Sequence, residues 1–223
     1  MNYRFNNTVK VAIDKVELVG ELIIPLEAES LILFCHGSGS SRFSPRNNFV
    51  ARAFHKKNIG TFLFDILTNE EDLIYENRFN IELLTERLIE ITKHISQRKE
   101  CTNLNIGYFG ASTGAASSFK AAVALPDLIH AIVSRGGRPD LAIDVASKIK
   151  SPTLLIVGEL DYKVIELNQA VYKVMKCEKE IKIVNNATHL FEEEGALQTV
   201  TSLAVDWFET HLKIKTNVQN EYK

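Results

Sequence analysis

Apolar runs rich in β-branched residues alternate with segments whose apolar residues recur every three or four positions, along most of the chain. This alternation is typical of strand–helix–strand units, which build a mostly parallel sheet with helices on both faces. The first two strands alternate polar and apolar residues and lie close together, so we expect an antiparallel hairpin at the sheet edge, ended by Pro25. Eight strands are predicted, at 9–13, 16–24, 31–35, 61–64, 104–109, 131–133, 153–157 and 181–184.

Helices are predicted between these strands. The clearest lies at 81–95, where apolar residues at steps of three and four form one stripe. The acidic segment 68–80 has no clear period, and we predict a loop there, at the mouth of the site. The other helices are expected at 47–57, after Ser112, at about 164–174 and at 197–212, with the acidic run 192–194 as the solvated start of the last one.

Composition limits the class of protein and of partner. A length of 223 residues with 45% hydrophobic and 24% charged residues fits one domain over 1–223, with a loose polar tail at 214–223. The net charge of −2 gives no support for nucleic acid as a partner. No stretch reaches the ~18 apolar residues of a membrane helix, and the three cysteines match no metal or disulfide pattern. We expect a cytoplasmic protein with no membrane partner, metal or cofactor, and the oligomeric state stays open.

The sharpest motif is Gly110-Ala111-Ser112-Thr113-Gly114, which follows a predicted strand and opens a run of small residues. In a strand–turn–helix setting, this G-x-S-x-G pattern is typical of a nucleophilic serine on a tight, strained turn. Glycines are needed on both sides because a Cβ there would collide with the neighbouring strand or helix. Ser112 is therefore the predicted nucleophile, and the alternative is a helix start packed closely against the sheet.

A serine hydroxyl needs a base, and the base needs an orienting group. Asp161 follows the strand at 153–157, and His189 follows the strand at 181–184. Both therefore lie at the same sheet edge as Ser112, in the chain order nucleophile, acid, histidine. Glu159 is the alternative acid, but its place at the strand end favours a side chain that is tied up or exposed.

A glycine-rich loop, His36-Gly37-Ser38-Gly39, follows the strand at 31–35. Acyl transfer forms a negative oxygen that must meet N–H donors already in place. We predict the N–H groups of Ser38 and Thr113 as these donors, and His36 as a structural residue that fixes the loop. A phosphate cradle is the alternative, but both Gly-Lys-Ser/Thr and the G-x-G-x-x-G spacing are missing.

These motifs, in this order, resemble the α/β-hydrolase superfamily over nearly the whole chain, from Val9 to Leu212. The closest resemblance is to serine-nucleophile members of its dienelactone-hydrolase-like branch, through the stretches 36–42, 110–116, 134–142 and 187–193. The resemblance implies an α/β-hydrolase fold with eight strands. Some such relatives are fused to a phosphoribosyltransferase domain, which we do not find in this sequence. Only 17 residues, 135–151, separate two strands where many relatives carry a cap, so we expect no cap domain.

One departure from the branch matters. Dienelactone hydrolases proper use a cysteine nucleophile, whereas position 112 is serine, so their substrate is not carried over. Cys35 lies at a strand end beside the glycine-rich loop and is expected to be a small core residue.

Two arginines, Arg135 and Arg138, follow the sixth strand at the active edge. Either could hold a substrate carboxylate with paired N–H bonds. The alternative is an internal salt bridge, to Asp140 or Asp65, and the sequence leaves both open.

The sequence thus predicts a serine hydrolase that acts on an ester or related acyl substrate through an acyl-enzyme. Its expected partner is a small acyl molecule of undefined chain length. A thioesterase or acyltransferase would use the same residues. A hydrolase-fold protein that only binds a small ligand is the non-enzymatic alternative.

Overall fold

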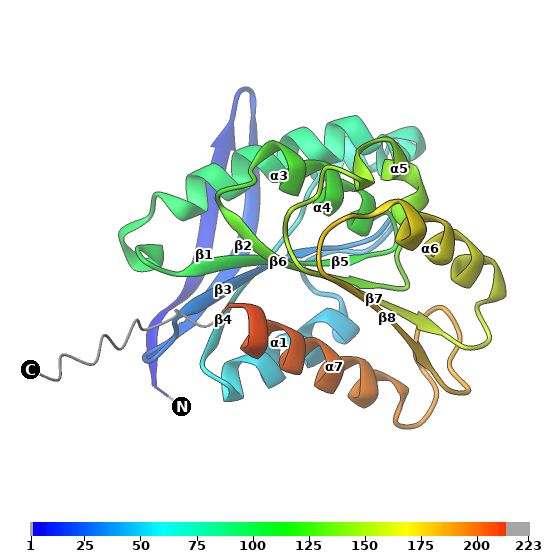
Figure 1. Cartoon of the computed structure of the whole chain (residues 1–223). Coiled ribbons are helices and arrows are strands. Elements are labelled where there is room, and N and C mark those ends of the chain that lie inside the picture. The colour runs from blue at the N-terminus through cyan, green and yellow to red at the C-terminus, as the bar shows by residue number, and fades with distance from the viewer. Residues whose placement is uncertain (1, 213–223) are drawn as a thin grey trace, which may run out of the picture.

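The computed structural model describes residues 2–212 and contains an eight-stranded sheet with helices on both faces (Figure 1). The strand order is β1-β2-β4-β3-β5-β6-β7-β8. β1 (Tyr3–Ile13) and β2 (Val16–Pro25) form the predicted antiparallel hairpin at one edge. The other six are mutually parallel: β3 (Ser30–Cys35), β4 (Ile59–Phe64), β5 (Asn105–Ala111), β6 (Ile129–Arg135), β7 (Thr153–Gly158) and β8 (Lys179–Val184). The predicted fold class is confirmed.

The helices divide between the two faces of the sheet (Figure 1). One face carries α3 (Ile81–Ser96), α4 (Thr113–Ala124), α5 (Ile143–Ala146) and α6 (Tyr162–Val174), and the other carries α1 (Pro45–Lys56) and α7 (Ala196–His211). Because the parallel strands are covered on both sides, β3, β4 and β7 are buried at every residue. Their continuous apolar sequences are explained by this double burial.

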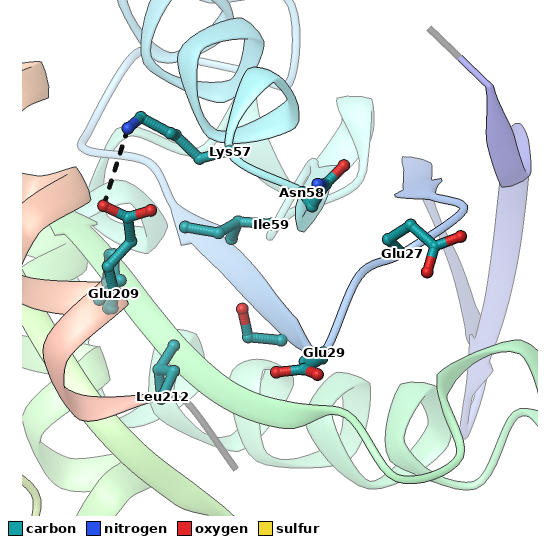
Figure 2. A pocket seen from close by; sticks show the side chains of 9 residues that line it. Glu27, Glu29, Lys57, Asn58, Ile59, Glu209 and Leu212 are labelled. Carbon is teal, nitrogen blue, oxygen red and sulfur yellow. Dashed lines mark ion pairs between the residues drawn. The ribbon is translucent and has the colours of Figure 1, made fainter.

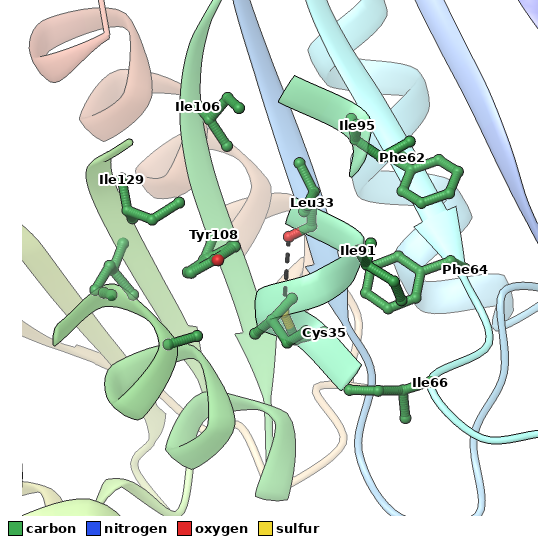
Figure 3. Packing of buried hydrophobic residues seen from close by; sticks show 14 of the residues in the cluster. Leu33, Cys35, Phe62, Phe64, Ile66, Ile91, Ile95, Ile106, Tyr108 and Ile129 are labelled. Atoms are coloured by element: carbon green, nitrogen blue, oxygen red, sulfur yellow. Dashed lines mark hydrogen bonds between the residues drawn. The ribbon is translucent and has the colours of Figure 1, made fainter. Parts of the chain in front are cut away.

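Each face has its own hydrophobic core. On the α3–α4 face, Ile91 and Ile95 pack with Phe62, Phe64 and other strand residues (Figure 3). The same core contains Cys35, which has no exposed surface, and burial raises the pKa of its thiol to about 12. The prediction of a core role for this cysteine is confirmed.

Two local predictions were wrong. The segment 68–80 contains α2 (Asn69–Asp72) and the 3₁₀ helix η1 (Tyr75–Phe79). A capping box between Thr68 and Glu71 starts α2, and T-x-x-E is the sequence pattern for it. The run 192–194 is not the start of α7, because Gly195 precedes the first turn and that turn contains no acidic residue.

The connection between β6 and β7 holds only the 3₁₀ helix η3 (Pro139–Ala142) and the short α5, so no cap domain covers the carboxyl ends of the strands. One further 3₁₀ helix, η2 (Lys99–Cys101), leads into β5. None of the helices in the described part of the chain is long and apolar enough to cross a membrane. The tail predicted at 214–223 lies outside the described residues.

Candidate active site

Ser112 lies on a sharp turn between β5 and α4, with φ 50° and ψ −122°. This is the left-handed region that a residue with a Cβ adopts only under strain. Three backbone bonds hold the turn. The Ser112 N–H donates to the Arg135 carbonyl at 3.4 Å, and the Ser112 carbonyl accepts from Ala115 at 3.1 Å and from Arg138 at 3.0 Å. The surrounding backbone therefore fixes the serine in place.

The flanking glycines leave room for this turn. A Cβ at Gly110 would lie 2.7 Å from the Cα of Ala115, and one at Gly114 would overlap the carbonyl oxygen of Cys35. The steric argument made from the motif is thus borne out in the structure. Gly37 adds a third close approach, because its Cβ would lie 2.9 Å from the Ser112 Cβ.

Asp161 and His189 meet at the same sheet edge. Asp161 precedes α6 directly after β7, and His189 lies in the loop after β8. The His189 Nδ1 lies 2.6 Å from the Asp161 Oδ2, and the aspartate side chain is largely buried. The other predicted candidate, Glu159, is exposed and accepts the Asn186 N–H at 2.7 Å. Of the two carboxylates, it is therefore Asp161 that contacts the imidazole.

The Ser112 hydroxyl makes no hydrogen bond to His189 within residues 2–212. Both residues lie next to the Arg135–Gly136 backbone. Arg135 binds the Ser112 N–H, and a Cβ on Gly136 would lie 3.5 Å from the His189 Nδ1. Catalytic hydrogen bonds are often long without substrate. The structure therefore pairs Asp161 with His189 and places the Ser112 turn near this pair.

The glycine-rich loop lies against the start of α4. The Ser38 N–H donates to the Thr113 Oγ1 at 3.1 Å, and Thr113 is the first residue of α4. The structure thus brings the two predicted oxyanion donors together. In the resting protein the Ser38 N–H is occupied by the threonine hydroxyl.

His36 anchors this loop. Its ring is buried, its Nε2 accepts the Ile66 N–H at 3.3 Å, and its Nδ1 lies 3.0 Å from the Gly37 carbonyl. Because Nε2 is the acceptor, Nδ1 is assigned the proton and donates to Gly37. Burial lowers the pKa of His36, which favours this neutral form. The structural role predicted for His36 is confirmed.

The two arginines after β6 have different surroundings. Arg138 binds Asp140 through two bonds, Nε to Oδ1 at 2.9 Å and Nη2 to Oδ2 at 2.8 Å. For this residue the structure has the internal salt bridge. Arg135 is buried and forms no such pair within residues 2–212, and Asp65 pairs with Arg42 instead.

Some residues of this edge were missed from the sequence. Gly136 has φ 50° and lies against His189, and the buried Asn168 donates to the Gly137 carbonyl at 3.0 Å. Arg46 in α1 binds Glu192 in the histidine loop at 2.7 Å. The Gly136-Gly137 pair was a visible signal for a tight backbone approach, whereas nothing in the sequence connects Arg46 to Glu192.

Within the described residues, no group of three histidine, cysteine or acidic side chains could hold a metal ion. The polar groups at this edge are two backbone N–H donors, one imidazole, one carboxylate that accepts, and the Ser112 hydroxyl. Such a set can activate a hydroxyl and stabilise a negative oxygen.

Comparison with known proteins identifies one family. The model of the dienelactone hydrolase family matches residues 62–213. The crystal structure of a dienelactone hydrolase from Anabaena variabilis is 42% identical, with a TM-score of 0.91 over 96% of this chain and 100% of that one. The Pyrococcus furiosus esterase Pf2001 has a TM-score of 0.76 at 17% identity, covering 94% of each chain, and shares the fold.

Two curated Mycobacterium tuberculosis proteins, provisionally named phosphoribosyl transferases, are 46% identical over 204 residues. The match covers 92% of this chain but only 46% of theirs. The chain therefore spans about half the length of these relatives. Their name refers to proteins in which about half of the sequence lies outside the match.

Proposed function

The chain belongs to the dienelactone hydrolase family, which supports a hydrolase activity, and from this premise we propose that it is a serine hydrolase of esters or related acyl compounds. The observation that carries the proposal is the bond between Asp161 and His189, at the sheet edge where Ser112 is held on its strained turn. In this proposal Ser112 is the nucleophile, Asp161 the acid and His189 the base, and their chain order is the usual one for this fold.

In the first step the Ser112 Oγ attacks the acyl carbon, and the His189 Nε2 takes the hydroxyl proton. The Nδ1 of the same ring stays bound to Asp161, which holds the tautomer and stabilises the imidazolium. The carbonyl oxygen becomes an oxyanion and accepts the N–H groups of Thr113 and Ser38. For this, the Ser38 N–H exchanges or shares its bond to the Thr113 hydroxyl.

The leaving group departs with the proton from His189, and an acyl-enzyme remains on Ser112. Water then gives its proton to His189 and attacks the acyl carbon, which releases the acid and restores the serine. The positive end of α4 begins next to Ser112 and favours the negative oxygen in both steps. The absence of a cap over β6 and β7 leaves this edge open to small or extended acyl substrates.

Replacement of Ser112 by alanine tests the proposal. Hydrolysis of 4-nitrophenyl acetate and butyrate should fall by at least roughly 10⁴-fold, because the covalent route is lost. A fluorophosphonate probe should label the wild-type protein and not Ser112→Ala. The matched control is Ser96→Ala, at the far end of α3, which should keep both activity and labelling. Equal hydrolysis by Ser112→Ala and the wild type would refute the proposal.

A further inference from the structure

Arg135 is a buried cation without a counter-ion. The residue is 8% exposed, and its Nε and Nη1 have neither accessible surface nor a hydrogen-bond partner. The third nitrogen, Nη2, is not enclosed in this way and makes no hydrogen bond within residues 2–212. A buried charge without partners is costly, and a native protein keeps one only where something compensates it.

Other arginines of this edge are neutralised inside the molecule. Arg138 binds Asp140, Arg42 binds Asp65 and Arg78 binds Asp72. Burial, together with the charge of Arg46, lowers the pKa of Arg135 to about 10, so it still carries its charge at neutral pH. Arg135 therefore differs from these three arginines in having no carboxylate partner within residues 2–212.

Arg46 is near enough to Arg135 for its charge to act on that side chain. Arg46 is in the first turn of α1, a turn that contains no acidic residue, and its one partner is the exposed Glu192. The amino-terminal end of this 12-residue helix also favours negative charge. The positive charge of Arg46 thus adds to that of Arg135, and within residues 2–212 the carboxylate that pairs with Arg46 is the exposed Glu192.

This positive cluster adjoins the proposed catalytic residues. The Arg135 carbonyl accepts the Ser112 N–H, and the next residue, Gly136, packs against His189. Glu192 lies three residues after His189, so the Arg46–Glu192 pair ties α1 to the histidine loop. A group bound at Arg135 would belong to a molecule that also lies at this edge.

We propose that Arg135, with Arg46 and the first turn of α1, binds an anionic group, a carboxylate or a phosphate, that the acyl substrate carries. The inference rests on the proposed function and narrows its substrate class to anionic esters. The guanidinium offers the N–H groups of Nη2, its one nitrogen that is not enclosed, to such an oxyanion, which compensates the buried charge and orients the substrate relative to Ser112. Arg138, already held by Asp140, takes no part.

The test uses two ester pairs whose members differ only in charge. Monoethyl succinate and ethyl succinamate place the charge on the acyl side, and 4-acetoxybenzoate and 4-acetoxybenzamide place it on the leaving group. The wild-type protein should hydrolyse the anionic member of at least one pair with a kcat/KM roughly tenfold to a hundredfold higher, as one charge-assisted contact provides. Equal kcat/KM in both pairs would overturn the inference and leave the proposed hydrolase intact.

Arg135→Gln should reduce that ratio to about one, mainly through KM for the anion, and keep turnover of the neutral ester. Arg135→Lys keeps the positive charge but loses the guanidinium group, so it should retain part of the ratio. Arg46→Gln should lower the ratio less than Arg135→Gln does. The matched control is Arg138→Gln. If the ratio persists in Arg135→Gln, or falls in Arg138→Gln instead, the assignment is wrong. If Arg135→Gln does not fold, Arg135→Lys and Arg46→Gln decide in its place, and full ratios in both would refute it.

Binding separates this inference from the proposed chemistry. Ser112→Ala should bind monoethyl succinate more tightly than ethyl succinamate in calorimetry, and the difference should disappear when Arg135→Gln is added. Inorganic phosphate and acetate as competitors distinguish the two kinds of anion. If the wild-type protein hydrolyses none of these esters but the anion is still bound more tightly in an Arg135-dependent way, the hydrolase proposal alone is refuted. If the wild-type protein hydrolyses the esters but shows no such binding preference, the anion site alone is refuted.

Discussion

The two edges of the parallel sheet make their tight turns with different residues. Before β4 and β5, at the amino-terminal edge, the left-handed positions are Asn58 and Asn103. At the carboxyl-terminal edge one is again an asparagine, Asn186, but the other non-glycine residues are Ser112 and Phe191, with φ 50° and 56°. Asparagine adopts this conformation readily, whereas serine and phenylalanine adopt it at a cost. The backbone strain is therefore concentrated at the edge that holds the proposed nucleophile.

Charge divides the edges in the same way. The pocket at the amino-terminal edge is lined by Glu27, Glu29, Glu209 and one cation, Lys57, which pairs with Glu209 at 3.9 Å (Figure 2). At the other edge, Arg135 has no carboxylate partner within residues 2–212. The acidic pocket favours a cationic ligand, whereas the unpaired buried Arg135 favours an anionic one. The two edges therefore differ in the charge of the ligand that each could bind.

The comparison teaches where this fold departs from its lowest-energy arrangement. At the amino-terminal edge, residue type and backbone agree, and the cation Lys57 is paired with Glu209. At the active edge, a serine is held in a glycine conformation and a guanidinium is buried alone. Such departures are expected where a surface has been shaped for chemistry. Four substitutions test whether the two edges differ as described.

The largest effect is expected at Asp161. Asp161→Asn should lower kcat for 4-nitrophenyl butyrate on the order of 10⁴-fold, because an amide can hold the wrong imidazole tautomer. Glu159→Gln is the matched control, since this carboxylate lies two residues away and binds only the Asn186 N–H. The kcat of both variants should be measured beside their thermal stability. A similar loss in both would show that charge at this edge, and not the bond to His189, supports activity.

The next effect is steric. Gly114→Ala should reduce the free energy of unfolding by about 3 kcal/mol or more, because its Cβ would overlap the carbonyl oxygen of Cys35 and backbone cannot give way. Gly60→Ala, at the amino-terminal edge, meets its nearest atom at 3.2 Å and should cost roughly 1 kcal/mol. Urea unfolding of both variants measures the difference. Equal costs would mean that the active edge is no more tightly packed than the other.

The third effect depends on pH and belongs to the amino-terminal edge. His55 is buried near the end of α1 and its Nε2 lies 2.7 Å from Thr61 Oγ1. Burial lowers its pKa from 6.5 to about 4. The folded state therefore keeps the ring neutral while the unfolded state takes up a proton. Stability should fall as the pH drops from 6.5 towards 4, by up to about 3 kcal/mol from this group.

His55→Gln isolates that contribution. Chemical denaturation at pH 7 and pH 4.5 should show a smaller acid-induced loss in the variant than in the wild type, whatever its stability at pH 7. Burial also lowers the pKa of His36 at the active edge, so a residual loss in the same direction should remain. An unchanged pH dependence would assign the acid sensitivity to the active edge.

The sequence predicted what depends on local pattern. The strands were found as apolar runs because double burial imposes that composition, and the Ser112 turn was found because its glycines are sequence neighbours. The amino-terminal half of β1 was missed, since residues 3–8 are mostly polar and exposed, with Phe5 as the half-buried exception, and pair with β2 beside them. Strand formation there depends on the cross-strand partner, which a sequence does not show.

In the candidate site, too, the features set by local sequence pattern were predicted and those set by contacts between distant residues were not. Ser112, Asp161 and His189 were proposed from motifs at strand ends, and the bond between the last two forms as that placement requires. The choice between Arg135 and Arg138 could not be made, because it depends on which carboxylate each guanidinium reaches in space. Arg138 reaches Asp140, two residues along the chain, whereas Arg135 forms no ion pair with any acid of residues 2–212.

The smallest effect is the most direct measure of strain. Ser112→Gly should raise the free energy of unfolding by about 1 kcal/mol, because φ 50° and ψ −122° suit glycine, and relief of about 1–3 kcal/mol exceeds the added chain entropy of roughly 0.4–1 kcal/mol. Ser112→Ala, which keeps a Cβ and the strain, is the matched control and should not be stabilised. Asn103→Gly carries the same change to the amino-terminal edge, where asparagine already tolerates the left-handed conformation, so only the entropy remains and stability should fall slightly. Opposite signs for the two glycine variants in urea denaturation would assign the stored strain to the active edge, whereas the same sign would mean that Ser112 is no more strained than an ordinary turn.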